Sequence, residues 1–380
     1  MFRLSLVFFI FIGSFLFISC KENTKELNSS EKGEQIKISY AKGFTIEDFN
    51  DHYILTVRDP LDSSKTIQQY YLYRSLEPEI KIKGMEYVHI PITDLASLST
   101  THLPFLEALK VEDKLIAFSG LKYIYSEKFN QRIEENLIYD IGNEGGINVE
   151  LLVVLQPDII MAYNSGNPEY DQFDKMRSLK LIPVLNNEYL ELIPLGQAEW
   201  IKFVATFFDK LSASQNLFSS VEAEYKTIQK ITDTIQNKPT VFTGLAFKGE
   251  WTVPGGKSFA ATFLKDAGAN YIWSADDKTG NFPVAFEEVI NKTKDADFWI
   301  HPGASQNLQE MVNTDIRFNY FNAFRIENVY NNNNRVNSAG GNDYWESAVF
   351  APQVVLKDLV KIFHPELMLN HSFVYYKHLN

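Results

Sequence analysis

Aromatic, histidine and amide side chains stand just past the ends of several predicted strands. In open α/β sheets, ligands bind outside the carboxyl ends of the strands. Aromatic rings offer a large, flat contact area at low entropic cost, so this placement predicts a cleft for a planar or bulky ligand. His301 or a tyrosine could also ligate a haem iron there. The candidate ligand-binding residues at these strand ends are Tyr123, Tyr125, Tyr163, Asn164, Phe247, Trp251 and His301, and Trp273 and Trp345 are added from loops nearby in the second half.

The sequence contains no motif of a nucleotide-binding loop, a serine hydrolase or a zinc protease. Residues 255–258 (GGKS) end like a phosphate-binding loop, but Trp251 stands where that loop needs its first glycine. Neither Gly-x-Ser-x-Gly nor His-Glu-x-x-His is present. The seven histidines lack a tight metal-ligand spacing. We therefore expect no catalytic residues, no resident cofactor and no enzyme activity.

Two carboxylates occupy matching positions in the two halves of the chain. Glu150 and Glu287 each stand on the first turn of a short predicted helix, followed by an acidic residue and an apolar strand. A carboxylate near a helix N-terminus is favourable in itself. Its occurrence at the same place in both halves points to a shared role.

A long amphipathic helix is predicted between the halves, at residues 212–237. Apolar side chains recur there at three- and four-residue steps, Ser212 or Ser214 can cap the start, and Lys238-Pro239 ends the pattern. The chain alternates strands and helices on both sides. This indicates an α/β fold of two Rossmann-like lobes, residues 36–211 and 238–380, joined by one long rigid helix with the ligand cleft between them.

The strands that must position the site follow from short apolar runs bounded by turn residues. In the first lobe they are expected at 36–40, 52–58, 69–74, 87–90, 114–118, 158–162 and 181–185, and in the second at 240–246, 297–300 and 327–330.

The first 35 residues read as a targeting segment and a tether. A basic start and an apolar run of about 15 residues, too short to span a bilayer, indicate a signal peptide over residues 1–19. Cys20, the only cysteine, follows Phe17-Ile18-Ser19, which resembles a bacterial lipobox. We expect lipidation of Cys20, which would hold the protein at a membrane. Residues 21–35 are polar and form a flexible tether.

Composition limits the classes of partner. At 380 residues there is room for two domains with good cores, and 29 Phe and 19 Tyr exceed what such cores usually need. A formal net charge of −12 with scattered basic residues argues against a nucleic-acid partner.

The sequence resembles the class III substrate-binding proteins of ABC importers, which deliver iron chelates, haem and cobalamin. The similarity covers about residues 36–370. It is carried by Glu191-x-x-Pro-Leu-Gly-x-Ala-Glu-Trp-Ile-Lys-Phe (191–203) with the long helix after it, and by the five shorter segments 99–103, 150–160, 251–258, 267–269 and 344–346.

The resemblance implies a lipid-anchored, extracytoplasmic protein of the cell envelope, most simply on the periplasmic face. It implies a ligand that is a ferric siderophore, haem or cobalamin, held between the lobes and delivered to an ABC permease and its ATPase. By motif position, Glu150 and Glu287 would dock into arginine pockets of the permease. We expect a monomer.

Two alternatives stay open. The first is a binding protein for a bare divalent metal such as zinc or manganese, with ligands from distant loops. The second is a haem or corrinoid capture protein that works without a permease. Few arginines fall in the predicted cleft loops, which disfavours a strongly anionic chelate; Arg317, Arg325 and Arg335 are the exceptions.

Overall fold

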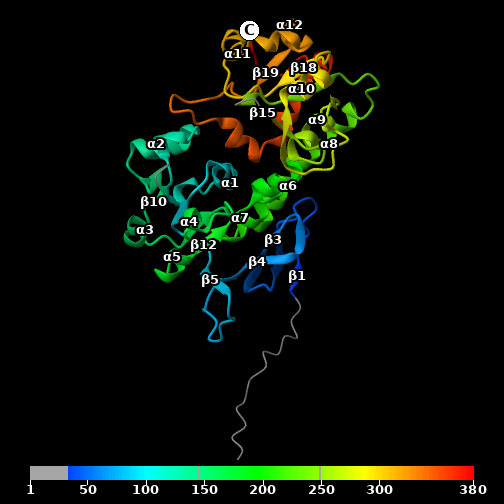
Figure 1. The fold of residues 1–380 in the computed structure, drawn as a ribbon. Helices are drawn as coiled ribbons and strands as arrows, with labels where there is room; N and C mark the ends of the chain where they lie inside the picture. The colour runs from blue at the N-terminus through cyan, green and yellow to red at the C-terminus, as the bar shows by residue number, and fades with distance from the viewer. Residues whose placement is uncertain (1–32, 144–145, 248–249) are drawn as a thin grey trace, which may run out of the picture.

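The computed structural model describes residues 33–143, 146–247 and 250–380. It contains two α/β lobes connected by a long helix (Figure 1). The predicted signal peptide, Cys20 and nearly all of the predicted tether lie outside the described residues. No helix in the described ranges is both long enough and apolar enough to cross a membrane.

The chain begins with a five-stranded sheet that the sequence pattern did not separate from the first lobe. Its strands run antiparallel to their neighbours, except β4 and β5, which are parallel. The sheet lies at the end of the molecule farthest from the second lobe (Figure 1). In spatial order its strands are β1 (Glu34–Gln35), β2 (Phe44–Asp48), β3 (His52–Asp59), β4 (Asp62–Tyr73) and β5 (Met85–His89).

The predicted strand at residues 36–40 is wrong, because these residues form a loop between β1 and β2. Ile36, Ile38 and Tyr40 alternate with polar residues, and this pattern is also typical of a strand. The other strand predictions of the first lobe match observed strands to within a few residues, apart from β4, which begins seven residues earlier at Asp62.

The first lobe is built on a five-stranded parallel sheet, as predicted for an α/β fold. The strand order is β12-β11-β6-β7-β8. The strands are β6 (Leu95–Ser97), β7 (Leu115–Phe118), β8 (Tyr139–Asp140), β11 (Ile159–Ala162) and β12 (Pro183–Leu185). The connecting helices are α1 (Leu103–Leu109), α2 (Glu127–Glu134), α3 (Val149–Leu155), α4 (Pro168–Asp171) and α5 (Phe173–Ser178).

The second lobe repeats this plan with an antiparallel edge strand. Its main sheet has the order β16-β13-β18-β19-β20, and only β20 is antiparallel to its neighbour. These strands are β13 (Thr240–Thr243), β16 (Asn270–Tyr271), β18 (Phe298–Ile300), β19 (Val329–Asn331) and β20 (Lys377–His378). A smaller antiparallel sheet contains β14 (Ala246–Phe247), β15 (Glu250–Pro254) and β17 (Asn281–Ala285). The helices are α9 (Phe259–Asp266), α10 (Phe286–Thr293), α11 (Leu308–Thr314), α12 (Asn322–Arg325) and α13 (Pro352–Phe363).

The helix between the lobes is α8 (Leu211–Thr232), which spans about 33 Å at about 1.5 Å per residue. It ends five residues before the predicted boundary at 237. Neither predicted serine caps it through its side chain, and the Ser214 hydroxyl instead donates to the Leu211 carbonyl. Buried residues recur in alternating steps of three and four along its whole length, so one continuous face is buried. They are Leu211, Ser214, Phe218, Val221, Tyr225, Ile228 and Thr232.

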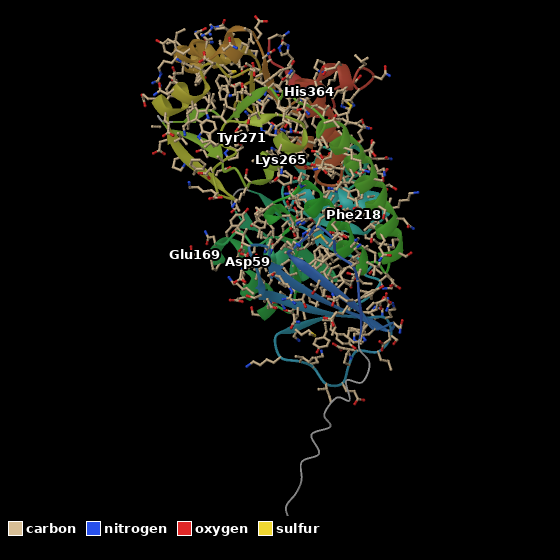
Figure 2. All side chains as sticks on the ribbon, turned by 90° about the vertical axis from the view of Figure 1, so that its right-hand side faces the viewer. Asp59, Glu169, Phe218, Lys265, Tyr271 and His364 are labelled. Carbon is tan, nitrogen blue, oxygen red and sulfur yellow. The ribbon has the colours of Figure 1, made fainter. Side chains whose placement is uncertain are left out.

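The two halves of α8 contact different lobes. On the side of the first lobe, the ring of Phe218 (Figure 2) lies 6.0 Å from that of Tyr40, whose hydroxyl donates to Glu222. On the side of the second lobe, the Tyr225 hydroxyl donates to the carboxylate of Asp266, the last residue of α9, at 2.8 Å. α8 therefore bridges the lobes by specific contacts as well as by chain connectivity.

Glu199, the last residue of α6 (Pro194–Glu199), holds the loop that was predicted to be a strand. Its fully buried carboxylate accepts hydrogen bonds from the backbone N–H groups of Ser39, Tyr40 and Ala41 at 2.7–3.0 Å. Lys202 donates to the same carboxylate at 2.7 Å. A buried carboxylate is costly unless it is fully hydrogen-bonded, and here it satisfies backbone groups that would otherwise need a strand partner.

Glu191 binds the next part of the same loop. It accepts from the backbone N–H groups of Lys42 and Gly43 and from the indole N–H of Trp200, at 2.8–3.0 Å. Two glutamates of the segment 191–203 thus receive all five backbone N–H groups of residues 39–43. This gives that sequence motif a structural role, since it attaches the N-terminal sheet to the helices before α8.

We predict that Glu199→Gln lowers the free energy of unfolding by about 2–4 kcal/mol, because an amide cannot accept from three N–H groups and leaves Lys202 without a buried counter-charge. Urea unfolding measures the change. Glu224→Gln is the matched control on α8, where the carboxylate is 42% exposed and pairs with Lys357, and it should cost less than about 1 kcal/mol. Equal losses in the two variants would contradict the anchoring role of Glu199.

Candidate functional site

Trp345 borders three hollows, of which two lie between the lobes and one lies within the second lobe. It lies in η6 (Asp343–Trp345) and is 58% exposed, whereas the other four tryptophans are buried. The hollows that it borders have volumes of about 350, 510 and 540 Å³. We call these the first, second and third hollow, and together they form the cleft.

The first hollow, of about 350 Å³, is lined mainly by rings from both lobes. The first lobe contributes Thr101, in η1 (Thr100–His102) after β6, and Tyr189, in η4 (Glu188–Leu190) after β12. The second lobe contributes Phe259 and Phe263 of α9 and Tyr344 of η6. Because these elements follow strands or face them across the lobe boundary, the hollow lies at the carboxyl edge of the first lobe's sheet, as predicted.

The second and third hollows are more polar. In the second, His301 follows β18, and Asn332 and Asn333 follow β19; the amides of Gln306 and Asn342 stand nearby. The third hollow lies between the turn at residues 59–61, the segment 189–192 and the second-lobe segments 258–260 and 279–281. Amide groups donate and accept, so these walls can bind carbonyl, hydroxyl and amide groups of a ligand.

His301 is held as a neutral side chain. Burial lowers its pKa to about 4. Its Nε2 bonds the hydroxyl of Tyr376, whose ring stacks on it with centroids 5.3 Å apart. Across residues 33–143, 146–247 and 250–380, no group of three or more His, Cys, Asp and Glu is placed to hold a metal ion.

A carboxyl group lies in the wall of the first hollow. Glu188 is 1% exposed, and within the described part of the chain neither of its carboxylate oxygens has a hydrogen-bond partner. Burial raises its pKa to about 7, although the nearby Thr101 hydroxyl favours the charged form. His102 Nε2 is 3.8 Å from a Glu188 oxygen, beyond hydrogen-bond distance.

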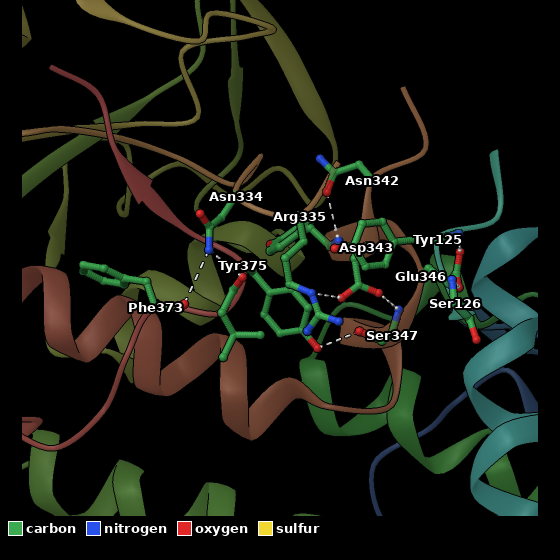
Figure 3. Close-up of polar contacts among 12 residues, drawn as sticks. Tyr125, Ser126, Asn334, Arg335, Asn342, Asp343, Glu346, Ser347, Phe373 and Tyr375 are labelled. Carbon is green, nitrogen blue, oxygen red and sulfur yellow. Dashed lines mark hydrogen bonds and ion pairs between the residues drawn. The ribbon is translucent and has the colours of Figure 1, made fainter. Parts of the chain in front are cut away.

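The lobes meet at a strap, residues 335–347 of the second lobe. Glu346 of the strap accepts hydrogen bonds from the backbone N–H groups of Tyr125 and Ser126 of the first lobe, both at 2.8 Å (Figure 3). Asn337 donates to the carbonyls of Lys122 and Ile124, both at 3.0 Å. These four bonds fasten the strap to the loop before α2.

Neighbouring residues of the strap face opposite sides. Asp343 and Glu346 border a further hollow of about 520 Å³ outside the cleft, together with Arg335. Arg335 pairs with Asp343 at 3.1 Å (Figure 3). Tyr344 and Trp345 face the cleft instead. The strap therefore fastens the lobes with one set of side chains and lines the cleft with the other.

The structure brings two of the predicted ligand-binding residues, His301 and Trp345, into the cleft. Tyr125 lies at the strap and borders the outer hollow. Tyr123 is beside it, and Gly341 of the strap passes so close that a Cβ there would lie 2.2 Å from the Tyr123 carbonyl oxygen. These two tyrosines therefore serve the contact between the lobes in this structure.

Tyr163 and Asn164 lie behind the cleft wall. Tyr163 borders a small separate hollow with Tyr170 and Asp171, and its ring meets the ring of Tyr189 edge-on at 6.0 Å. The Tyr189 hydroxyl donates to the Asn164 carbonyl at 2.6 Å. Both residues thus support Tyr189, which itself faces the ligand space.

The positions of Trp251 and Trp273 correct the sequence interpretation. Side chains alternate along β15, so that Trp251 points into the lobe, is fully buried and donates its indole N–H to the Thr243 carbonyl at 2.8 Å. Trp273 is 5% exposed and packs against Tyr271. Neither indole is available to a ligand. Phe247 lies in β14, and the direction of its side chain is not described.

The sequence analysis missed Glu188, Tyr189 and Tyr344. Glu188 and Tyr189 come just after β12, so the same strand-end rule could have found them. They directly precede the segment 191–203 and the long helix, so the sequence interpretation assigned this region to the connection between the lobes and not to the site. Tyr344 is adjacent to Trp345, which was predicted to bind the ligand, so the same loop could have indicated both residues.

Glu150 and Glu287 are exposed on the first turns of α3 and α10. Glu150 is 3.4 Å from Lys175, with 80% of its side chain exposed. Two exposed carboxylates, one on each lobe, are accessible to a partner, and their docking role stays a prediction.

The sequence is similar to a known protein family and to individual proteins outside this chain. A model of the periplasmic binding proteins matches residues 95–335. The uncharacterized lipoprotein MJ0878 of Methanocaldococcus jannaschii is 26% identical over 295 residues, which cover 74% of this chain and 68% of that protein.

Solved structures share the fold at low identity. The haem-binding protein HutB of Vibrio cholerae is 17% identical with a TM-score of 0.54, covering 70% of this chain and 98% of that one. The vitamin B12-binding protein BtuF of the same organism is 15% identical with a TM-score of 0.51, covering 74% and 99%. The N-terminal sheet β1–β5 precedes the region that the family model matches.

We predict that Glu346 makes stability depend on pH. Burial raises its pKa from about 4.5 in the unfolded chain to about 7, so the folded protein binds the proton more tightly. This contribution is fully present below pH 4.5 and is lost as the pH rises through 7. Glu346→Gln should therefore stabilise the protein, relative to wild type, by about 1–3 kcal/mol more at pH 8 than at pH 5.

Urea unfolding at pH 5, 6, 7 and 8 measures this difference, and subtraction of the wild-type values removes the titration of Asp343, Glu107 and other groups. Glu134→Gln, on the exposed side of α2, is the control and should give a difference independent of pH. The same flat profile for Glu346→Gln would disprove the prediction.

Proposed function

Because the chain belongs to the periplasmic binding protein family, we propose that it is the substrate-binding lipoprotein of an ABC importer and captures a metal chelate or tetrapyrrole between its lobes. Members of this family bind solutes, and this chain has the two-lobed α/β fold that such binding uses. The proposal covers the importer role and the class of ligand.

The observation that supports this ligand class best is the cleft around Trp345. A half-exposed indole, surrounded by further rings and amide-rich walls, gives a large contact area for a rigid, bulky guest. The structural relatives named above bind haem and vitamin B12, which are guests of this kind. No bond has to be broken, so the function needs no catalytic residue.

The location follows from the same comparisons. The family is periplasmic, and one relative is a lipoprotein, which supports an extracytoplasmic protein. Lipidation of Cys20 would keep the binding protein near a membrane-embedded permease. The bare-metal alternative has less support, because the described residues offer no converging set of ligands.

We predict that one of cobalamin, haem or a ferric siderophore quenches the tryptophan fluorescence of the full-length protein with a micromolar or lower Kd. Trp345→Ala should weaken this binding about 10-fold or more, since it removes the shared wall of all three hollows. Tyr320→Ala, an exposed ring in the second lobe, is the control and should bind as wild type does. Absence of binding to every compound tested would overturn the proposed function.

We predict that Glu150→Ala combined with Glu287→Ala abolishes uptake by cells while the Kd for the ligand stays within about twofold, because both carboxylates lie on the outer surface of the lobes. Radiolabelled or coloured ligand measures uptake. The matched control is Glu134→Ala with Glu366→Ala, one exposed glutamate on each lobe. Normal uptake by the first double variant would exclude the docking assignment.

A further inference from the structure

The buried carboxyl group of Glu188 has a function still to be explained. Glu188 borders the first hollow, and its two buried oxygens have no hydrogen-bond partner among the described residues. Buried polar groups in folded proteins are nearly always paired, and one left unpaired costs free energy of the order of 1–3 kcal/mol. A group kept at such a cost beside a cavity is placed to pair with a ligand that enters the cavity.

The neighbouring protein groups do not provide that partner. Burial lowers the pKa of His102 to about 3, so its ring is neutral, and its Nε2 remains 3.8 Å away from Glu188. The Thr101 hydroxyl is 2.8 Å from that of Ser99; it is close enough to favour the charged form of Glu188 but makes no hydrogen bond to either carboxylate oxygen. The nearest other carboxylate, Glu191, accepts bonds from Lys42, Gly43 and Trp200 and carries no donor.

The rest of the cleft has the same electrostatic character. None of the described residues that line the three hollows is lysine or arginine. Their charged members are Glu188, Glu191 and Asp59. The arginines that the sequence left as exceptions are engaged elsewhere: Arg335 pairs with Asp343 beside the outer hollow, Arg317 pairs with Asp315, and Arg325 bonds the Tyr320 carbonyl.

Cleft walls of this kind select against anions. A carboxylate or catecholate ligand would lose its hydration without gaining a cationic partner, and desolvation of an unpaired charge is expensive. The rings of Tyr189, Phe259, Phe263 and Trp345 instead favour apolar or cationic groups.

We propose that Glu188 is a specificity-determining acceptor, and that the ligand of this cleft has no net negative charge and presents an N–H or O–H donor (an amide, hydroxyl or protonated amine) to Glu188. The inference rests on the proposed function and narrows it to neutral or cationic chelates. Anionic chelates such as ferric tris-catecholates, and haem with its two carboxylates, are then poor ligands.

Titration of the full-length protein with compounds of different charge tests this. The probes are cyanocobalamin and a neutral ferric trihydroxamate, a cationic ferric trihydroxamate with a free amine, a trianionic ferric tris-catecholate, and haem. We expect at least one neutral or cationic probe to bind about 100-fold more tightly than both anionic probes. Tightest binding of an anionic probe would overturn the inference and leave the proposed function intact.

Two substitutions separate charge from hydrogen bonding at Glu188. Glu188→Met keeps the length of the side chain and removes both acceptors, so it should weaken the preferred probe about 10-fold or more. Glu188→Gln keeps one acceptor without charge, and it should weaken a cationic probe about 10-fold but a neutral probe by less than about threefold. Both variants should melt at or above the wild-type temperature, because an uncharged group is cheaper to bury. A purely structural Glu188 would instead lower the melting temperature and leave ligand preference unchanged.

A variant that gains affinity for an anionic probe tests the role of cleft charge without changing Glu188. Leu61 is 66% exposed at the rim of the third hollow. If the absence of lysine and arginine from the described lining excludes anions, Leu61→Arg should tighten the tris-catecholate about threefold or more, and no gain would count against the inference. If no probe of any charge binds the wild-type protein, the proposed function fails and the inference falls with it.

Discussion

The arrangement of the lobes depends on a single buried face of α8. Its seven buried side chains follow one another in steps of three and four, so they form an uninterrupted seam from one lobe to the other. In its first half, that seam meets the segment anchored by Glu199, and in its second half it meets Asp266 at the close of α9. A helix packed in this way along its length does not bend easily at any one residue. The cleft therefore keeps its position between two lobes whose separation is set by a rod.

After α8, the strap is the second element that determines the position of the cleft walls. Glu346 and Asn337 fasten it to backbone groups of the first lobe, and those groups are available to any sequence. The cleft wall, in contrast, depends on particular side chains: the ring of Trp345, the amides after β19 and the unpaired carboxyl of Glu188. The position of the strap thus depends on contacts to backbone groups, whereas the character of the cleft walls depends on a few side chains, and one fold can carry different sites in this way.

The sequence was sufficient for the alternation of strands and helices, the two lobes and the long helix, because these follow from periodicity and turn residues. The strand-end rule also located His301, whereas Trp345 was predicted from a loop nearby in the same half. It failed at Trp251, because the rule identifies a position and does not say to which face of β15 the side chain points. It failed at residues 36–40, where Ile36, Ile38 and Tyr40 alternate like a strand although their neighbours bond to carboxylates from a distant segment. The burial of Glu188 could not be read either, since it arises from residues brought together only by the fold.

The strap has one more consequence. Glu346, which grips the first lobe, and Trp345, which lies against the guest space, are adjacent on the chain. The Cα atoms of two adjacent residues stay about 3.8 Å apart, so a backbone displacement that frees the carboxylate from its N–H donors also displaces the indole. Separation of the lobes and distortion of the cleft are therefore coupled in this structure.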